Sequence, residues 1–332
     1  MERNFLIFIS ILFIIKDIVT STQYNNQEII LKIKEKGYQH ILTTDPERDK
    51  TNTCPDKLYI NEIENNKINK CGPIYLNEKN STIRMIWYNK ILYYRMFKDL
   101  VNITEVDLSN FDTSLYDNFN MMFQNCISLT SINFGNKERT STLNENNLNS
   151  MFYNCKSLIS INLSTFKKLK ITSMGYVFFN CISLKYINLS GIDTSNVKTM
   201  DNMFNNCTSL TSIDMSNLDT SSVTNMDSIF INCKNLEFIN LKNDVFSKLE
   251  SKDNAFQGIK PNFVICIDPN SVLIRNNINE NCVNISCELN WKHYQKKIIN
   301  PFRNDCVEKC GEKYEYDNQC LNDCPDNYKP NI

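Results

Sequence analysis

Residues 194–219 read TSNVKTMDNMFNNCTSLTSIDMSNLD, and residues 220–245 read TSSVTNMDSIFINCKNLEFINLKNDV. The two stretches align without a gap, so that phenylalanine, cysteine and most apolar residues fall at equivalent positions. A repeat of roughly 20–50 residues is typical of stacked-repeat proteins, in which each unit buries its apolar stripe only against its neighbours. This pair of stretches decides the fold class.

The same unit extends in both directions along the chain. Seven phenylalanines are separated by 26, 29, 26, 26, 26 and 26 residues, and a cysteine follows three positions after five of them. The interval of 29 predicts a three-residue insertion in the polar stretch 136–149. Leu100 and Ile259 replace cysteine in the first and last units, as expected of terminal repeats. The phenylalanines, called the phenylalanine ladder below, are Phe97, Phe123, Phe152, Phe178, Phe204, Phe230 and Phe256.

Each unit divides into two hydrophobic periods. In the first half, apolar residues from Val197 to Cys207 recur at steps of three or four, which predicts one face of a short helix. In the second half, Ile213 and Met215 have the period-2 spacing of a strand with one buried face. Because no unit buries its stripe alone, the sequence predicts an α/β solenoid whose parallel strands lie about 4.8 Å apart. The methionines at these spacings are predicted to belong to the core.

The motif Leu-x-x-Ile-x-Leu with Asn-Cys just ahead of it resembles a leucine-rich repeat, and MFxNCxSLTSIDMSNLDTSSVTNM is similar to the BspA-like surface proteins. The resemblance covers residues 96–258, about half of the chain, and residues 82–97 resemble the segment leading into such arrays. It implies a secreted or surface-exposed protein that binds host, matrix or neighbouring-cell molecules. It implies no catalytic residues, and a scaffold does not by itself fix a ligand.

The N-terminal segment indicates the compartment. Residues 5–15, FLIFISILFII, are eleven apolar or small residues, too few to span a bilayer comfortably but typical of a signal peptide. We therefore predict a signal peptide over 1–21 and no membrane span in the mature chain. The remaining divisions are an N-terminal region and cap at 22–95, about seven repeat units at 96–258, a C-terminal cap at 259–300 and a cysteine-rich module at 301–332.

Composition excludes several functional classes. The net charge of −1, from 36 basic and 37 acidic residues, lacks the basic footprint of a nucleic-acid-binding protein. The two histidines, His40 and His293, stand outside any metal or catalytic motif, and no HExxH, GxSxG, P-loop or GxGxxG is present. The sequence thus predicts a non-enzymatic protein that uses no cofactor and no metal.

The fourteen cysteines form two groups. The five that follow the ladder phenylalanines share one phase, so they are predicted to be buried thiols with parallel side chains that are poorly placed to bridge. The others suit disulfides in an oxidising compartment, and one of Cys266, Cys282 and Cys287 is expected to stay free or to bond another chain. Six are predicted to be bridged: Cys54, Cys71, Cys306, Cys310, Cys320 and Cys324.

The last four cysteines have the spacing C-x3-C-x9-C-x3-C. This resembles a furin-like cysteine-rich module, and the resemblance implies the pairs Cys306–Cys320 and Cys310–Cys324. Four cysteines allow three connectivities, and a zinc site made of the same four thiolates is the alternative reading.

The outer face of the predicted sheet is the candidate binding surface. Two rows of residues flank the inward isoleucines, and the aromatic Tyr186 and Phe238 are suitable anchors for a partner. The alternative is that the small polar side chains only form hydrogen-bonded ladders. The hypothetical ligand-binding residues are Glu105, Asp107, Tyr186, Asn188, Ser212, Asp214, Phe238 and Asn240, and the rows also contain Ser131, Ser160, Asn133 and Asn162.

Sequons complicate this surface, because glycans on Asn162 and Asn188 would screen it. N-x-Ser/Thr occurs at Asn80, Asn102, Asn162, Asn188, Asn206 and Asn284. Taken together, the sequence predicts a secreted or cell-surface interaction protein with a protein or glycan partner on a host, matrix or neighbouring-cell surface. Two rivals remain open: a passive coat or matrix component without a specific ligand, and a truncated ectodomain of a larger receptor or enzyme.

Overall fold

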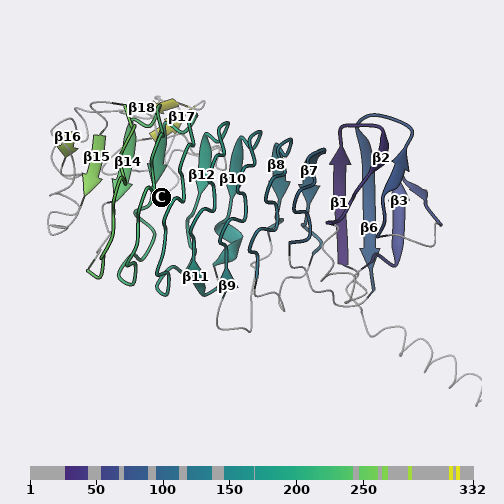
Figure 1. Cartoon of the computed structure of the whole chain (residues 1–332), viewed down its shortest axis with the longest axis horizontal. Helices are drawn as coiled ribbons and strands as arrows, with labels where there is room; N and C mark the ends of the chain where they lie inside the picture. The colour runs from purple at the N-terminus through teal and green to yellow at the C-terminus, as the bar shows by residue number, and fades with distance from the viewer. Residues whose placement is uncertain are drawn as a thin grey trace, which may run out of the picture.

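The computed structural model describes residues 27–43, 54–66, 71–88, 95–111, 118–136, 146–167, 169–241, 247–260, 264–267, 283–285, 314–316 and 319–321. Short strands lie side by side along the long axis of the molecule, with the N-terminal sheet at one end and β15 and β16 at the other (Figure 1). The predicted signal peptide, Cys282, Cys287, Cys306, Cys310 and Cys324 lie outside these ranges.

The N-terminal region is a mixed sheet built on two long strands. β1 (Gln27–Ile33) pairs antiparallel with β6 (Ser81–Trp87) and with β7 (Ile103–Asp107), and the strand order is β4-β3-β6-β1-β7-β8. Every second residue of β1 is buried, as a strand with one core face requires. The other elements are β2 (Gly37–Gln39), which pairs with β5 (Ile74–Leu76), β3 (Lys57–Ile60) and β4 (Ile63–Glu64).

The repeat region forms short parallel strands in register. Ser160 pairs with Tyr186, and Ser212 pairs with Phe238, so that residues 26 apart lie next to each other. The strands of this column are β8 (Ser131–Asn133), β10 (Ser160–Asn162), β12 (Tyr186–Asn188), β13 (Ser212–Asp214), β14 (Phe238–Leu241), β15 (Val264–Ile267) and β16 (Val283–Ile285). Elsewhere lie β9 (Asn146–Asn147), β11 (Ile171–Ser173), and the hairpin of β17 (Tyr314–Tyr316) with β18 (Gln319–Leu321).

The prediction of a short helix in each unit was wrong. Within the described ranges the one helix is a single 3-10 turn, Ser164–Phe166. The residues two before and two after every ladder phenylalanine have positive φ, which interrupts an α-helix. At the second of these positions the residue is Asn in five units, a type that tolerates the left-handed conformation. We call the segment from four residues before to three residues after each ladder phenylalanine the turn ribbon.

Backbone hydrogen bonds explain why the turn ribbon imitates helical spacing. Around Phe204, alternate N–H groups donate to carbonyl oxygens of the following unit at 2.8–2.9 Å, as Phe204 does to Ile229. The N–H groups between them close four-residue turns, as Cys207 does on the carbonyl of Phe204 at 3.1 Å. Successive turns bring apolar side chains inward every three or four residues. The ribbon therefore has the apolar period of a helix while half of its hydrogen bonds tie neighbouring units together.

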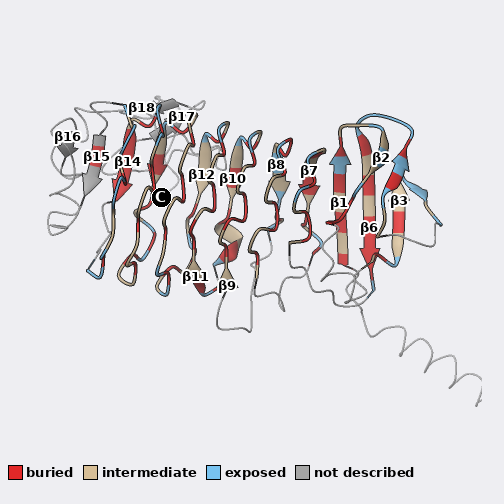
Figure 2. Cartoon of the chain, in the orientation of Figure 1, coloured by how far each residue is buried: buried red, intermediate tan, exposed pale blue. Residues whose placement is uncertain are grey.

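The phenylalanine ladder lies at the centre of the core, as predicted. Neighbouring rings of the first five pairs are stacked with centroids 5.3–5.6 Å apart and interplanar angles of 4–12°. Phe178, Phe204 and the adjoining Met200 and Met203 are fully buried. Buried residues run as a continuous band through the repeats (Figure 2).

The five ladder cysteines are buried free thiols, as their shared phase predicted. Each Sγ donates to the carbonyl oxygen of a ladder phenylalanine in the preceding unit, at 3.0–3.1 Å; Cys207, for example, donates to Phe178. Burial raises the pKa of all five thiols, and it raises the pKa of Cys233 to about 12. Such thiols stay protonated and unreactive at neutral pH.

A second ladder, formed by asparagine side chains, runs beside the cysteines. It occupies the position before Leu100 and before the first four ladder cysteines, and the Nδ2 of one unit donates to the side-chain oxygen of the preceding unit at 2.6–3.0 Å. This amide ladder consists of Asp99, Asn125, Asn154, Asn180 and Asn206. Its bonds join side chains of five successive units.

Candidate functional site

The strand register brings the predicted binding residues into two adjoining rows. Glu105 lies opposite Ser131 and Asp107 opposite Asn133 at the N-terminal end of the array. Farther along, Tyr186 lies opposite Ser160, and Phe238 lies opposite Ser212. The structure thus confirms the register on which the two rows were based, although the rows differ in how their side chains are used.

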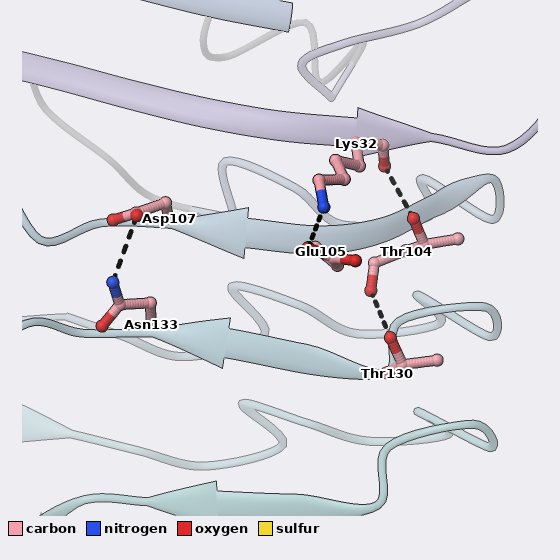
Figure 3. A network of polar contacts seen from close by, with 6 residues as sticks. All are labelled: Lys32, Thr104, Glu105, Asp107, Thr130 and Asn133. Carbon is pink, nitrogen blue, oxygen red and sulfur yellow. Dashed lines mark hydrogen bonds and ion pairs between the residues drawn. The ribbon is translucent and has the colours of Figure 1, made fainter. Parts of the chain in front are cut away.

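Glu105 and Asp107 are engaged where the N-terminal sheet meets the array (Figure 3). The Glu105 carboxylate forms an ion pair with Lys32 of β1 at 2.7 Å, and Asp107 accepts from Asn133 Nδ2 at 3.1 Å. Both members of the Lys32–Glu105 pair are about half exposed, so the pair contributes little to stability. These contacts indicate that the two acids help to join the sheet to the first repeats.

The second row mostly closes the turns that follow the strands. The side-chain oxygen of Asn188 accepts from the N–H of Ser190 at 3.0 Å, and that of Asp214 accepts from the N–H of Ser216 at 3.1 Å. Asp107, Asn133 and Asn162 accept in the same way from the residue two positions on. Asn and Asp side chains of this type compete with the neighbouring strand for backbone N–H groups, and they therefore terminate strands.

Phe238 is a correction, because it is not an exposed anchor. Its side chain is 1% exposed, and all four residues of β14 are buried, including Asn240 at 3%. By contrast, β8, β10, β12 and β13 keep at least a partly exposed outer face: every residue of β12 is half-buried, and β13 buries only its central Ile213. β14 is thus covered on both faces. Asn240 Nδ2 donates to Asp214 at 3.0 Å within this covered region.

What remains open on the sheet face is its centre, on β8, β10, β12 and β13. Ser131 is exposed, whereas Ser160, Tyr186 and Ser212 are half-buried. Beneath them, Ile161 and Ile213 belong to the core. Tyr186 is therefore the one aromatic of the predicted pair that a partner could reach on this face.

A second aromatic group, which the sequence analysis missed, lies on the turn ribbon. The rings of Tyr153 and Phe179 are stacked with centroids 4.7 Å apart at 4°, and Tyr176 contacts Phe179 at 5.6 Å. All three are half-buried. Burial and the neighbouring Asp201 carboxylate raise the pKa of Tyr176. The signal was present in the sequence, because Tyr153 and Phe179 each directly follow a ladder phenylalanine and are 26 residues apart.

The asparagines of the described sequons differ in the hydrogen bonds that their side-chain amides form. Asn206 Nδ2 donates to Asn180 at 2.6 Å within the amide ladder, and Asn102 Nδ2 donates to Gln39 at 2.9 Å. Asn80 lies in an exposed turn before β6. For Asn162 and Asn188 the side-chain oxygen is used in a turn. The side chain of Asn284 lies outside the described part of the chain.

Cys54 and Cys71 form a disulfide, with their Cα atoms 5.0 Å apart. In the portion of the chain that the structure describes, no group of three or more His, Cys, Asp or Glu residues is arranged to hold a metal ion. Over the same portion, no helix has the length and hydropathy needed to cross a bilayer.

Two family models match the chain. Residues 60–173 match the BspA type leucine rich repeat region, in six copies, and residues 146–263 match a family described as Mycoplasma protein of unknown function, DUF285. No curated protein matches the chain. The chain therefore carries BspA-type leucine-rich repeats, as the motifs in the sequence indicated. Neither match reaches the C-terminal cysteines, so the furin-like module stays a prediction.

Proposed function

We propose that the chain is a secreted or cell-surface, non-enzymatic interaction protein. Its partner would be a protein or glycan on a host, matrix or neighbouring-cell surface, held against the centre of the sheet face. The observation that supports this proposal is the position of Tyr186. This half-buried aromatic lies in register with Ser160, above a core that is filled independently of it.

Aromatic side chains surrounded by small polar residues concentrate binding energy, because the aromatic fills a pocket of the partner while the small neighbours allow close approach. Ser160, on the strand before Tyr186, and Ser212, at the equivalent position of the next unit, are such neighbours. The proposed surface is thus smaller than the sequence suggested, because Glu105, Asp107 and Phe238 are otherwise occupied.

The experiment begins with a screen of the secreted chain against matrix proteins and cell-surface glycans. Once a binder is found, Tyr186→Ser should weaken its affinity by about 2 kcal/mol, roughly thirty-fold, as loss of a hot spot does. Tyr153→Ser is the matched control, because it removes a half-buried tyrosine from the turn ribbon. If Tyr153→Ser abolishes binding while Tyr186→Ser does not, recognition belongs to the turn ribbon.

A passive surface coat is the second candidate. It is favoured by the row of residues that ends the strands. In this row the side-chain oxygens of Asn188 and Asp214 accept hydrogen bonds from backbone N–H groups of the turns that follow. Under this alternative the folded chain has no partner whose affinity depends on Tyr186. A screen that yields no saturable binder would support the coat over recognition.

A further inference from the structure

The turns that precede the repeat strands form an exposed edge along the array (Figure 2). The residue four positions after each of the first six ladder phenylalanines lies in these turns. Three of these residues are aliphatic yet exposed: Val101 at 42%, Ile127 at 38% and Ile182 at 36%. Ile159, in the turn of the unit between them, is 47% exposed. We define the turn ridge as Val101, Ile127, Lys156, Ile182, Thr208 and Lys234.

Folding does not require aliphatic residues on the turn ridge. In the five units that contain a ladder cysteine, the cysteine before this position and the leucine two residues after it are buried, as Cys181 and Leu184 show. Lys156, Thr208 and Lys234 occupy the same position in other units without disturbing the stack. Exposed aliphatic side chains scattered singly need no explanation, but here they occupy the same position in three of the first four units, along one edge.

Uncompensated positive charge accompanies the aliphatic side chains. Lys156, Lys185 and Lys234 are exposed, and in the part of the chain described here none of them forms an ion pair. Two carboxylates that lie close to ridge residues in the sequence, Asp99 and Glu237, are already paired. Asp99 lies 3.7 Å from Lys98, and Glu237 lies 3.0 Å from Lys260.

A line of turns along the edge of an elongated molecule suits a flat partner better than a narrow one. Aliphatic tips that enter the interface, with lysines beside them whose ammonium groups stay in water, are the features that hold proteins on anionic lipid. We propose that the turn ridge rests on an anionic bilayer surface, with Val101, Ile127 and Ile182 at the interface. This leaves the sheet face available, so the inference is independent of the proposed ligand.

The test is flotation of the secreted chain with phosphatidylcholine vesicles that either contain or lack phosphatidylserine. The parent should float with the phosphatidylserine vesicles, and added salt should reduce this binding. Lys156→Gln should weaken partitioning about five-fold, and so should Lys234→Gln, because each lysine near such a surface contributes comparably. Ile127→Ser combined with Ile182→Ser should reduce the binding that persists at high salt.

Lys198→Gln and Ile63→Ser are the matched controls, since both residues are exposed and lie away from the turn ridge. Every variant carries the same N-terminal residues, so differences between variants report the turn ridge alone. The proposal fails if the parent does not float with phosphatidylserine vesicles, or if the control variants lose as much binding as the ridge variants. A parent retained by an acidic protein but by neither vesicle would also overturn it.

Discussion

The N-terminal sheet and the repeat array solve the same packing problem in different ways. In the sheet, β1 pairs with β6 and β7, strands about 50 residues or more away along the chain, and each pairing uses different side chains. In the array, each unit contacts equivalent residues of the units before and after it, through the same phenylalanine, cysteine and asparagine positions. The sheet therefore depends on many individual contacts, whereas the array depends on a few positions used repeatedly.

This difference predicts where damage spreads. A lost contact in the sheet affects one strand pair and its neighbours. A lost ladder residue in the array affects two interfaces at once, because every inner unit contacts two others and stability is a sum of unit and interface terms. Three changes test this contrast.

The largest effect is expected for Phe204→Ala. Removing a fully buried ring that is stacked on Phe178 and Phe230 should lower the free energy of unfolding by about 3–5 kcal/mol. Hydrogen exchange should show lost protection at the amides of both neighbouring units, while β1 and β6 keep theirs. Phe179→Ala, which truncates a half-buried ring, serves as the control and should cost less. Uniform loss of protection across both regions would contradict the contrast.

Removal of the Cys54–Cys71 disulfide should have the next largest effect. The two cysteines are 17 residues apart. A disulfide that closes a loop of that size raises the free energy of unfolding by about 3 kcal/mol, because it restricts the unfolded chain. The double change Cys54→Ser, Cys71→Ser should therefore raise exchange in β3 and β5, while the central units of the array keep their protection. A reducing agent should destabilise the parent but not the double variant. Equal loss in the central units would show that the two regions unfold as one.

The smallest effect concerns pH and belongs to the array alone. The folded thiols hold their protons to high pH, since burial raises the pKa of Cys233 to about 12, whereas unfolded thiols ionise near pH 9. A group whose pKa is raised by folding stabilises fully below the unfolded pKa and loses that contribution as pH rises toward the folded pKa. Urea unfolding should therefore show stability falling as the pH rises above 9, and Cys233 alone should account for about 1 kcal/mol of the fall between pH 9 and pH 10. Cys233→Ala should reduce this slope, and an unchanged slope would contradict the assignment.

The repeat period, the buried phenylalanine ladder, the free thiols and the strand register were all predicted from the sequence. These features follow from the similarity of the units. If one unit buries a side chain at a given position, the neighbouring units bury the equivalent side chain. The turn ribbon was not predictable from apolar spacing, since turns and helices share a period of three to four residues. Asn at the position before each cysteine hinted at left-handed backbone, but Tyr176 and Met121 adopt it too. Their strain is offset by hydrogen bonds to the next unit, which no single unit reveals.

The sheet-face prediction failed at Phe238 for a related reason. Repetition predicts that equivalent positions share an environment, and this holds while both neighbours of a strand are repeats. Near the end of the array this no longer holds, because β14 is buried on both faces. The burial of Phe238 could not be predicted from the sequence, because the equivalent aromatic residue two units earlier, Tyr186, is half-buried.

The amide ladder also bears on how such an array could lengthen. Each inner rung, such as Asn154 or Asn180, both donates one hydrogen bond and accepts one. A unit copied by duplication of its coding sequence would bring a matching donor and acceptor, and the ladder would close around it. The ends differ, because Asp99 has only acceptors, and among the described residues the rungs stop at Asn206, ahead of Asn232 and Gly258 at the equivalent positions of the last two units. We therefore expect duplication of an interior unit such as that of Asn154 or Asn180 to preserve the ladder, and duplication of a terminal unit to interrupt it.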